Sequence, residues 1–305
     1  MLRETIELSS KEQWLELRSR DVTSTEVAAL FDLNPYMSKF ELWQRKKNNL
    51  VVTIEENERM KWGSRLEHTI AQGISEDFNL PTTPFKSYMR IPELKVGSSF
   101  DYLINKGTDL EAILEIKNVD SMMFKDKWLM EDGEITEAPP HIELQVQHQL
   151  FVSGKKTAYI GALVGGNKVY LIKREYDEGL VNEIKSRVVK FWESIDKNLA
   201  PSPDFKSDYK FISSMLNRSQ SGYEVENFSN ELHMLVEQYK KVSEQEKEIS
   251  ETKDIIKAKI LMIVGEAEKV KGDGFTISAG MVKGGPISYV RKDYRNMRIN
   301  FKREK

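Results

Sequence analysis

The 305-residue chain contains no cysteine and only four histidines. Without cysteine, disulfides, thiolate zinc sites, iron–sulfur clusters and cysteine nucleophiles are excluded, and so few histidines argue against a zinc centre. No stretch approaches the roughly eighteen apolar residues of a transmembrane helix. The first ten residues, MLRETIELSS, also lack the apolar core of a secretory signal. We therefore expect a cytoplasmic protein with no membrane partner.

Neither sign of charge dominates, since 46 Lys and Arg face 48 Asp and Glu, for a net charge of −2. Nucleic-acid-binding domains are usually basic, so the total by itself argues weakly against DNA. The distribution is uneven, however: residues 283–305 hold eight basic and two acidic residues (+6), which leaves −8 for residues 1–282. Such a basic end can contact phosphates, although a solvated tail fits the same pattern.

Several common functional motifs are absent. The chain has no G-x-x-x-x-G-K-[ST], no G-x-G-x-x-G and no G-x-S-x-G. This argues against a P-loop NTPase, a dinucleotide-binding domain and a serine hydrolase of the nucleophile-elbow type. The segment Gly161–Gly166 predicts a strand and a turn instead.

The hydrophobic pattern predicts alternating helices and strands over the first two thirds of the chain. A capping box at Ser10 and Gln13 opens the first helical stretch, within residues 10–31. Further helices are predicted at 39–46, 60–78, 141–151 and 178–196, and strands at 96–104, 112–118, 158–164 and 168–173. The first two strands form a hairpin through the polar residues 105–109, and Gly165-Gly166-Asn167 joins the other two.

The last third has a different composition. Residues 199–208 and 217–222 are rich in Pro, Ser and charged residues, which indicates a linker. Residues 228–264 predict a long charged helix with an apolar seam spaced alternately by three and four, broken by Glu246 and Lys253. The seam residues are 235, 239, 242, 249, 256, 260 and 263. Glycines between short β-forming runs predict a small hairpin after it. We expect three parts: residues 1–200, a linker over 201–223, and an extension over 224–305.

One acidic residue falls on an apolar helix face. Glu67 follows Gly63 by four residues and precedes Ile70 by three, so it lies on the inward side of its helix. A buried carboxylate must be paired or bind a metal. A salt bridge in the core explains this position equally well.

Two strands bring further acids together. On the strand 112–118, Glu115 and Lys117 share one face, and Asp101 lies on the preceding strand. If the strands pair, Asp101 and Glu115 can converge, and two adjacent carboxylates resist ionisation unless a divalent cation binds them. A surface hairpin with an ordinary ion pair is the alternative.

Two polar clusters complete the set of candidates. Arg18 precedes the hydroxyl-bearing Thr23, Ser24 and Thr25 at a predicted helix start, which suits a phosphate or an ordinary N-cap. On the helix 141–151, Gln145 and Gln149 lie on one face with His141 and can hold water, phosphate or a carboxylate. We interpret the four histidines as structural or solvated.

In their order along the chain, these motifs resemble one known family. The order is Arg with Thr-Ser-Thr-Glu-Val, Asn-Pro-Tyr with Glu-Leu-Trp, Gly-x-x-x-Glu, Ser-x-Asp, Glu-x-Lys, Gln-Val-Gln-His-Gln-Leu and Phe-Trp. It resembles the YqaJ-type viral recombinases, the branch of the PD-(D/E)xK nucleases that includes lambda exonuclease, over residues 14–192. The resemblance implies an α/β (α+β) restriction-endonuclease-like core, a mixed central β-sheet flanked by helices. The C-terminal long helix and hairpin look like an extension found in phage members.

The resemblance also implies roles for single residues. Two Mg²⁺ ions, for which Mn²⁺ can substitute, would be held by carboxylates and one main-chain carbonyl, and a lysine and a glutamine would complete the catalytic set. The implied metal ligands are Glu67, Asp101, Glu115 and the Ile116 carbonyl; the catalytic residues are Asp101, Glu115, Lys117 and Gln145; and the 5′-phosphate pocket is Arg18, Ser24 and Thr25. Phe100 and Tyr102 replace the family's usual proline and glycine around Asp101, so we expect a loop of different shape.

The implied activity is 5′→3′ exonucleolytic digestion of double-stranded DNA ends, which leaves 3′ single strands for annealing-based recombination. The implied partners are a single-strand annealing protein and further copies of the chain in a ring, in the cytoplasm of a bacterial host if the protein is phage encoded. Two alternatives stay open. One is an endonuclease or structure-specific nuclease on the same core, and the other is a non-catalytic DNA-binding or assembly module.

Overall fold

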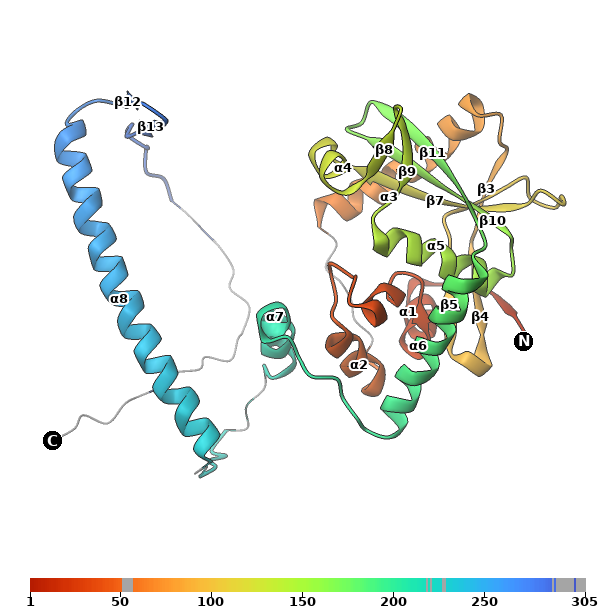
Figure 1. The fold of residues 1–305 in the computed structure, drawn as a ribbon, viewed down its shortest axis with the longest axis horizontal. Coiled ribbons are helices and arrows are strands. Elements are labelled where there is room, and N and C mark those ends of the chain that lie inside the picture. The colour runs from red at the N-terminus through yellow and green to blue at the C-terminus, as the bar shows by residue number, and fades with distance from the viewer. Residues whose placement is uncertain are drawn as a thin grey trace. The chain divides into compact units, whose positions relative to one another are not determined.

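The computed structural model describes residues 1–50, 57–217, 219, 221–226, 229–286, 288 and 299. The chain divides into two compact units, Met1–Ile212 and Ser213–Lys305 (Figure 1). Most of the basic end at 283–305 lies outside the described residues. Along the described chain, no helix combines the length and apolar character needed to cross a membrane.

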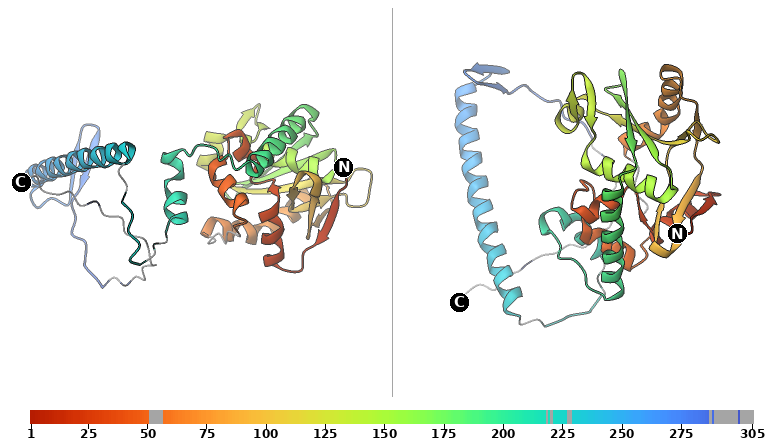
Figure 2. Two further views of the ribbon diagram at one scale, coloured as in Figure 1. Left: turned by 90° about the horizontal axis from the view of Figure 1, so that it is seen from below. Right: turned by 45° about the vertical axis from the view of Figure 1, so that its right-hand side comes forward.

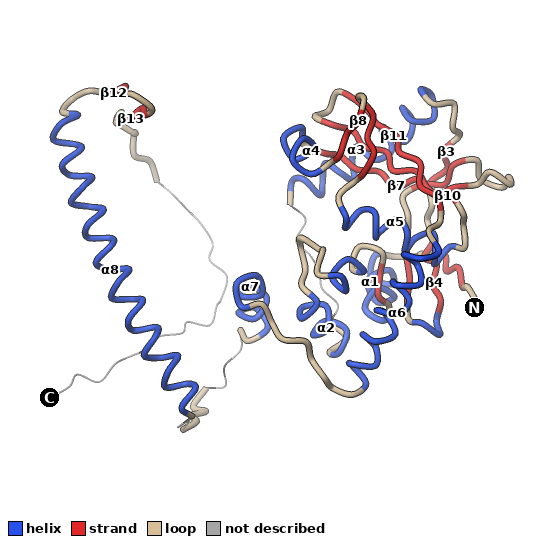
Figure 3. The backbone as a smooth tube through the Cα atoms, in the orientation of Figure 1, coloured by secondary structure: helices blue, strands red, loops and turns tan. Residues whose placement is uncertain are grey.

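A mixed five-stranded sheet forms the centre of the first unit (Figure 3). Its strands, in spatial order, are β11 (Lys168–Glu175), β10 (Thr157–Val164), β7 (Ala112–Val119), β6 (Tyr102–Ile104) and β3 (Thr82–Pro84). β7 and β10 are parallel and the other neighbours are antiparallel. Since parallel strands need a crossover, the chain returns from β7 to β10 through helix α5 (Pro140–Ser153). The predicted mixed sheet flanked by helices is confirmed.

Two helices cover the two faces of this sheet. Helix α3 (Glu58–Asp77) packs Ile70, Ala71 and Ile74 against the face formed by alternate residues of β6 and β7. Helix α5 packs on the opposite face through Val146 and Leu150. Gly161 on β10 permits the close approach of α3, because a Cβ there would lie 2.4 Å from Ile74 Cδ1. Side chains that alternate along β7 therefore point toward different helices.

A second sheet, six helical segments and a small hairpin surround the central sheet of this unit. The sheet has the order β1 (Glu4–Glu7), β4 (Ser87–Ile91), β5 (Val96–Ser98) and β2 (Val22–Thr23). Its core is shared with the short 3₁₀ helix η1 (Val27–Phe31) and with α6 (Glu178–Asp196). The remaining elements are α1 (Lys11–Arg20), α2 (Lys39–Lys47), η2 (Pro92–Leu94), α4 (Ser121–Lys127) and the hairpin β8 (Leu129–Glu131) with β9 (Glu134–Glu137).

The C-terminal part begins with α7 (Phe205–Met215), a helix inside the segment that we predicted as linker. The second unit contains α8 (Asn230–Val264), which Figure 2 shows as one uninterrupted helix. The hairpin β12 (Lys269–Gly272) with β13 (Phe275–Ser278) follows it. The predicted long helix and terminal hairpin are both confirmed.

One predicted strand is wrong. Residues 96–104 do not form a single strand, because β5 and β6 belong to different sheets and the chain crosses between them at residues 99–101. Phe100, which we expected to alter the loop, fixes the crossing by stacking on Phe85 with a centroid distance of 4.1 Å. Only the second half pairs with β7 as predicted. Strands β1, β3, β4, β8 and β9 were not predicted.

Candidate active site

Asp101 lies where the chain passes from one sheet to the other. Its main-chain carbonyl accepts a hydrogen bond from the Phe85 N–H (3.0 Å), and its Oδ2 accepts one from the Ile116 N–H (2.7 Å). The β6–β7 pairing stops at Leu114, so the carboxylate takes the place of a strand partner for Ile116. Asp101 is thereby held against the edge of β7.

Glu115 occupies the centre of the site and is 3% exposed. Its Oε1 accepts hydrogen bonds from Lys117 Nζ (2.5 Å) and Gln145 Nε2 (2.6 Å), and its Oε2 accepts one from Gln149 Nε2 (2.6 Å). The two glutamines are one turn apart on α5, which covers this face of β7. Three donors therefore hold one buried carboxylate in a single orientation.

Glu67 approaches from α3 on the other side of β7. It is half-buried, and among the described residues it makes no hydrogen bond or ion pair. Burial and the Glu115 charge raise the pKa of its carboxyl, against the opposing effect of Lys117. Burial, followed by Glu115, also raises the pKa of Asp101 well above its usual value. The charge of Glu115 thus acts on both Glu67 and Asp101. From the sequence we expected Asp101 and Glu115 to converge, and we treated Glu67 separately.

Lys117 supplies the positive charge of the cluster. Burial by itself would lower the pKa of its amine, but Glu115 and Asp101 together outweigh burial and raise it. At neutral pH the side chain is therefore an ammonium. It can donate hydrogen bonds and stabilise negative charge.

The chemistry of these donors fits a hard divalent cation. Glu67, Asp101, Glu115 and the Ile116 carbonyl all offer oxygen, the ligand that Mg²⁺ takes. Burial first and the Glu115 charge second raise the pKa values of Glu67 and Asp101, and a cation would relieve the repulsion from Glu115. Gln149 Oε1 is a further buried oxygen without a hydrogen-bond partner in the described structure. Within that same part of the chain, no three Asp, Glu or His side chains already form a closed ligand cluster.

The predicted phosphate pocket is partly assembled at the end of α1. Arg18 Nη2 donates to Thr25 Oγ1 (2.9 Å), and its guanidinium lies over the Trp14 ring at 4.5 Å from the centroid. Thr25 is exposed. Ser24 is different: it is 3% exposed, and its hydroxyl accepts a hydrogen bond from Ser98 Oγ (3.0 Å). The structure therefore brings Arg18 and Thr25 together at the surface and turns Ser24 inward.

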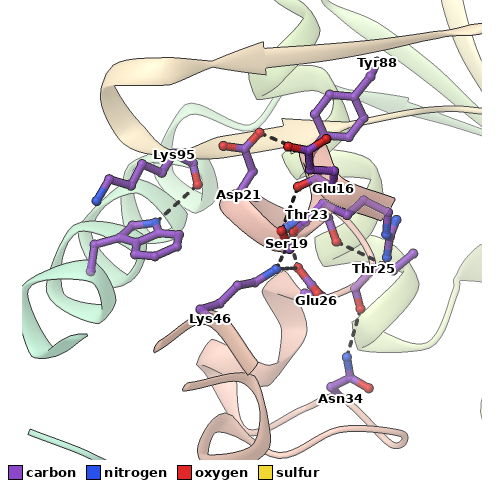
Figure 4. A network of polar contacts seen from close by, with 12 residues as sticks. Glu16, Ser19, Asp21, Thr23, Thr25, Glu26, Asn34, Lys46, Tyr88 and Lys95 are labelled. Carbon is purple, nitrogen blue, oxygen red and sulfur yellow. Dashed lines mark hydrogen bonds and ion pairs between the residues drawn. The ribbon is translucent and has the colours of Figure 1, made fainter. Parts of the chain in front are cut away.

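A buried ion pair lies directly beneath this pocket (Figure 4). Lys46 Nζ donates to Glu26 Oε2 (2.7 Å) and to the Arg18 carbonyl (2.7 Å), and Glu26 Oε2 also accepts the Thr23 N–H (2.9 Å). Lys46 therefore joins α2 both to the end of α1 and to the turn that carries Thr25. It positions the pocket without facing it.

The pocket and the carboxylate cluster share one loop. Trp14 Nε1 donates to Ser99 Oγ (3.2 Å), and Ser99 precedes Asp101 by two residues. Ser98, at the end of β5, holds Ser24. The loop between β5 and β6 therefore connects the Arg18 pocket with the Asp101 carboxylate.

A cavity of about 470 Å³ is lined by the residues that follow Lys117 in the sequence. Glu58, Arg59 and Trp62 of α3 line one side, and residues 118–121 with the 165–166 turn line the other. Trp62 is half exposed, and the Arg65 guanidinium lies 5.1 Å from its ring centroid.

Sequence reasoning missed two residues that shape these sites and left a third out of the catalytic set. Gln145 and Gln149 were expected on one helix face that can hold a carboxylate, but the resemblance gave a catalytic role to Gln145 alone, although spacing by four predicts that both reach one strand residue. Lys46 and Glu26 were not singled out. Lys46 lies three residues after Trp43, hence on the buried face of its helix, and a lysine there calls for a carboxylate partner.

Comparison with known proteins finds that part of the chain matches a protein family. Residues 13–156 match the profile described as the YqaJ-like viral recombinase domain. The chain is 30% identical over 186 residues to the "Uncharacterized protein YqaJ" of Bacillus subtilis (strain 168). That match covers 60% of this chain and 56% of the relative, so the chain spans just over half the relative's length.

Among solved structures, the chain is similar to an alkaline exonuclease from Laribacter hongkongensis, with 17% identity and a TM-score of 0.46 over 67% of this chain and 98% of that one. It is also similar to a phage-related exonuclease from Haemophilus somnus 129PT, with 14% identity and a TM-score of 0.36 over 63% of this chain and 89% of that one.

Proposed function

Because the chain carries a YqaJ-like viral recombinase domain over residues 13–156, we propose that it is a metal-dependent deoxyribonuclease that digests duplex DNA from 5′ ends and leaves 3′ single strands. One observation carries the proposal: a buried Glu115 is held by Lys117, Gln145 and Gln149, beside an Asp101 fixed to the same strand. Burying a charged carboxylate next to another acid costs folding free energy, even when three donors hold it. Hydrolysis of a phosphodiester makes use of that arrangement.

The chain's own groups would divide the work as follows. Glu67, Asp101, Glu115 and the Ile116 carbonyl would hold the cation. When bound, Mg²⁺ supplies positive charge that polarises the phosphodiester and lowers the pKa of a water. Lys117, an ammonium with a raised pKa, orients the attacking water and stabilises negative charge as it develops on the phosphate. The two glutamines keep Glu115 from rotating away.

Arg18 and Thr25 would select the end of the strand. A guanidinium and a hydroxyl 2.9 Å apart can share the oxygens of a terminal phosphate. Their connection to Asp101 through the β5–β6 loop would hold that phosphate at a constant distance from the reacting bond. A grip on the 5′ end would set the polarity of digestion.

The proposal extends to partners. A 3′ single strand is the substrate of a single-strand annealing protein, and a ring of copies would keep the enzyme on its duplex. The family resemblance supports both.

Metal-dependent digestion of defined substrates tests the activity. We expect the protein to degrade linear duplex DNA with Mg²⁺, but not with EDTA, and to leave closed circles intact. Cutting of closed circles would indicate an endonuclease. Absence of any metal-dependent cutting would favour the non-catalytic module.

Lysine substitutions connect the activity to this site. Lys117→Ala should abolish cleavage while DNA binding, measured in EDTA, is kept. Lys173→Ala is the matched control. Lys173 on β11 also pairs with a glutamate two residues away, Glu175 (2.5 Å), but the side chains of this pair are both exposed. Lys173→Ala should cleave at the wild-type rate. Turnover retained by Lys117→Ala would remove this residue from the mechanism.

End selection is tested with Arg18→Ala on duplexes that differ only in a 5′-phosphate or 5′-hydroxyl. We expect the larger loss on the phosphorylated end, since only that end loses a charge-assisted contact. Equal loss on both ends would contradict a phosphate pocket.

A further inference from the structure

Within its own unit, the long helix α8 leaves an apolar seam uncovered. Of its 35 residues, only Val264 is buried. All seven apolar seam residues are exposed, with exposures from 39% to 87%: Leu235, Tyr239, Val242, Ile249, Ile256, Ile260 and Ile263. Most of the stability of helices in proteins comes from packing an apolar face rather than from intrinsic propensity. We therefore expect this seam to pack against a partner.

The spacing of the seam specifies a second helix as that partner. The steps alternate between four and three residues from 235 to 263, a span of four heptads, which is the pattern of a coiled coil. Only Glu246 and Lys253 interrupt it with charge. Both are exposed, and among the described residues neither makes a hydrogen bond or an ion pair.

We propose that the partner is α8 of a second copy of this chain, in antiparallel orientation. In a parallel pair, Glu246 would face Glu246 and Lys253 would face Lys253, so both polar layers would be repulsive. The seam is nearly symmetric about Ile249, since 246 precedes it by three residues and 253 follows it by four. Reversing one helix about position 251, so that each row of the seam packs against the other row, places Glu246 within one turn of Lys253 of the second copy, twice.

The apolar seam positions agree with this reversal. About the same centre, Tyr239 meets Ile263 and Val242 meets Ile260, while Ile249 lies about one turn from Ile249 of the second copy. Most residues that flank the seam carry no charge, so the orientation depends mainly on Glu246 and Lys253. The uncharged flanking residues include Gln238, Ser243, Gln245, Ser250 and Thr252. The pairing goes beyond the proposed nuclease activity and does not depend on it.

Cross-linking of the full chain tests the orientation, and the absence of native cysteine makes single engineered cysteines specific. With a short bifunctional thiol reagent, Ile249→Cys should cross-link to itself. Leu235→Cys should not, because the two copies of residue 235 would lie about 48 Å apart, at 1.5 Å for each of 32 residues. A mixture of Leu235→Cys and Ile263→Cys should form the mixed dimer. Self-cross-linking of Leu235→Cys would overturn the antiparallel arrangement.

Charge exchange tests the pairing itself. Glu246→Lys or Lys253→Glu alone should raise the dissociation constant about fivefold, equivalent to about 1 kcal/mol, as judged by Ile249→Cys cross-linking over a dilution series. The double exchange Glu246→Lys/Lys253→Glu should restore it. Equal loss in single and double variants, or a wild-type chain that light scattering finds monomeric at every concentration, would refute the proposal.

Discussion

The buried Lys46–Glu26 pair makes Lys46→Met the most informative substitution in the N-terminal sheet region. The two side chains are only 2% and 9% exposed, and their charged atoms lie 2.7 Å apart. Burial by itself would raise the pKa of Glu26, but Lys46 and Arg18 outweigh it and lower that pKa. Glu26 is therefore ionised in the folded protein. Removing the lysine would leave this charge buried without its main partner.

The loss of stability expected for Lys46→Met follows from the contacts that Lys46 makes. Loss of one member of a buried ion pair costs about 3–5 kcal/mol, and Glu26 would keep only the Thr23 N–H. The hydrogen bond from Lys46 to the Arg18 carbonyl is lost as well, for about 1 kcal/mol. Methionine fills the space of the lysine stem, so no large cavity adds to the sum. We expect the free energy of unfolding to fall by about 5 kcal/mol, a large part of the roughly 5–15 kcal/mol of a typical domain.

Urea denaturation followed by tryptophan fluorescence measures this change, because all five tryptophans lie within residues 1–212 and report on that unit alone. Lys46→Met/Glu26→Gln should recover about half of the loss, since it removes the unpaired charge. Lys39→Met is the matched control on the same helix: its pair with Asp32 is 34% and 71% exposed, so it should cost less than about 0.5 kcal/mol. If Lys46→Met costs no more than Lys39→Met, or the double variant recovers nothing, the reasoning is wrong.

Two further predictions concern helix α5. Gln149→Leu leaves one oxygen of Glu115 without its donor and should cost about 1–3 kcal/mol of stability and slow cleavage; a wild-type rate would make Gln149 purely structural. His148 is fully buried, and burial lowers its pKa to about 4, against smaller opposing effects of Glu26 and the Val22 main chain. The folded state therefore binds fewer protons than the unfolded chain, so stability should fall by about 3 kcal/mol as pH drops from 6.5 to 4, at about 1.4 kcal/mol per unit. His148→Leu should flatten that part of the pH profile of unfolding, and an unchanged slope would refute the assignment.

Helices and strands with a strong period were predictable from the sequence alone. The helix 178–196 has the predicted bounds, and the strand predicted at 158–164 begins one residue earlier, at Thr157. Both were predictable because each buries one continuous apolar face and its own period records which face that is. Short edge strands such as β3 and β4 were not predicted, since three to five residues contain too few repeats to distinguish a strand from a loop.

The residues of the candidate site likewise divide into those that the sequence predicted and those that only the structure revealed. Glu115 and Lys117 were predicted as neighbours on one strand face, because strand alternation is a local property, and the structure joins them at 2.5 Å. Gln149 and Lys46 needed the structure. Their roles depend on partners 34 and 20 residues away in the chain, and no local pattern states which residue a side chain will reach.

The sequence by itself determined the types of group available. It established that no metal site can use a cysteine thiolate, that no disulfide can form, which residues could carry charge into a core, and that a long helix would have an apolar seam. Tertiary structure decided which of these groups meet. The strand predicted over residues 96–104 divides between two sheets, and that division carries Asp101 to the edge of β7 and ties it, through Ser99 and Trp14, to the Arg18 pocket. Local alternation specifies a face, but only packing against a particular neighbour selects the sheet to which a strand belongs.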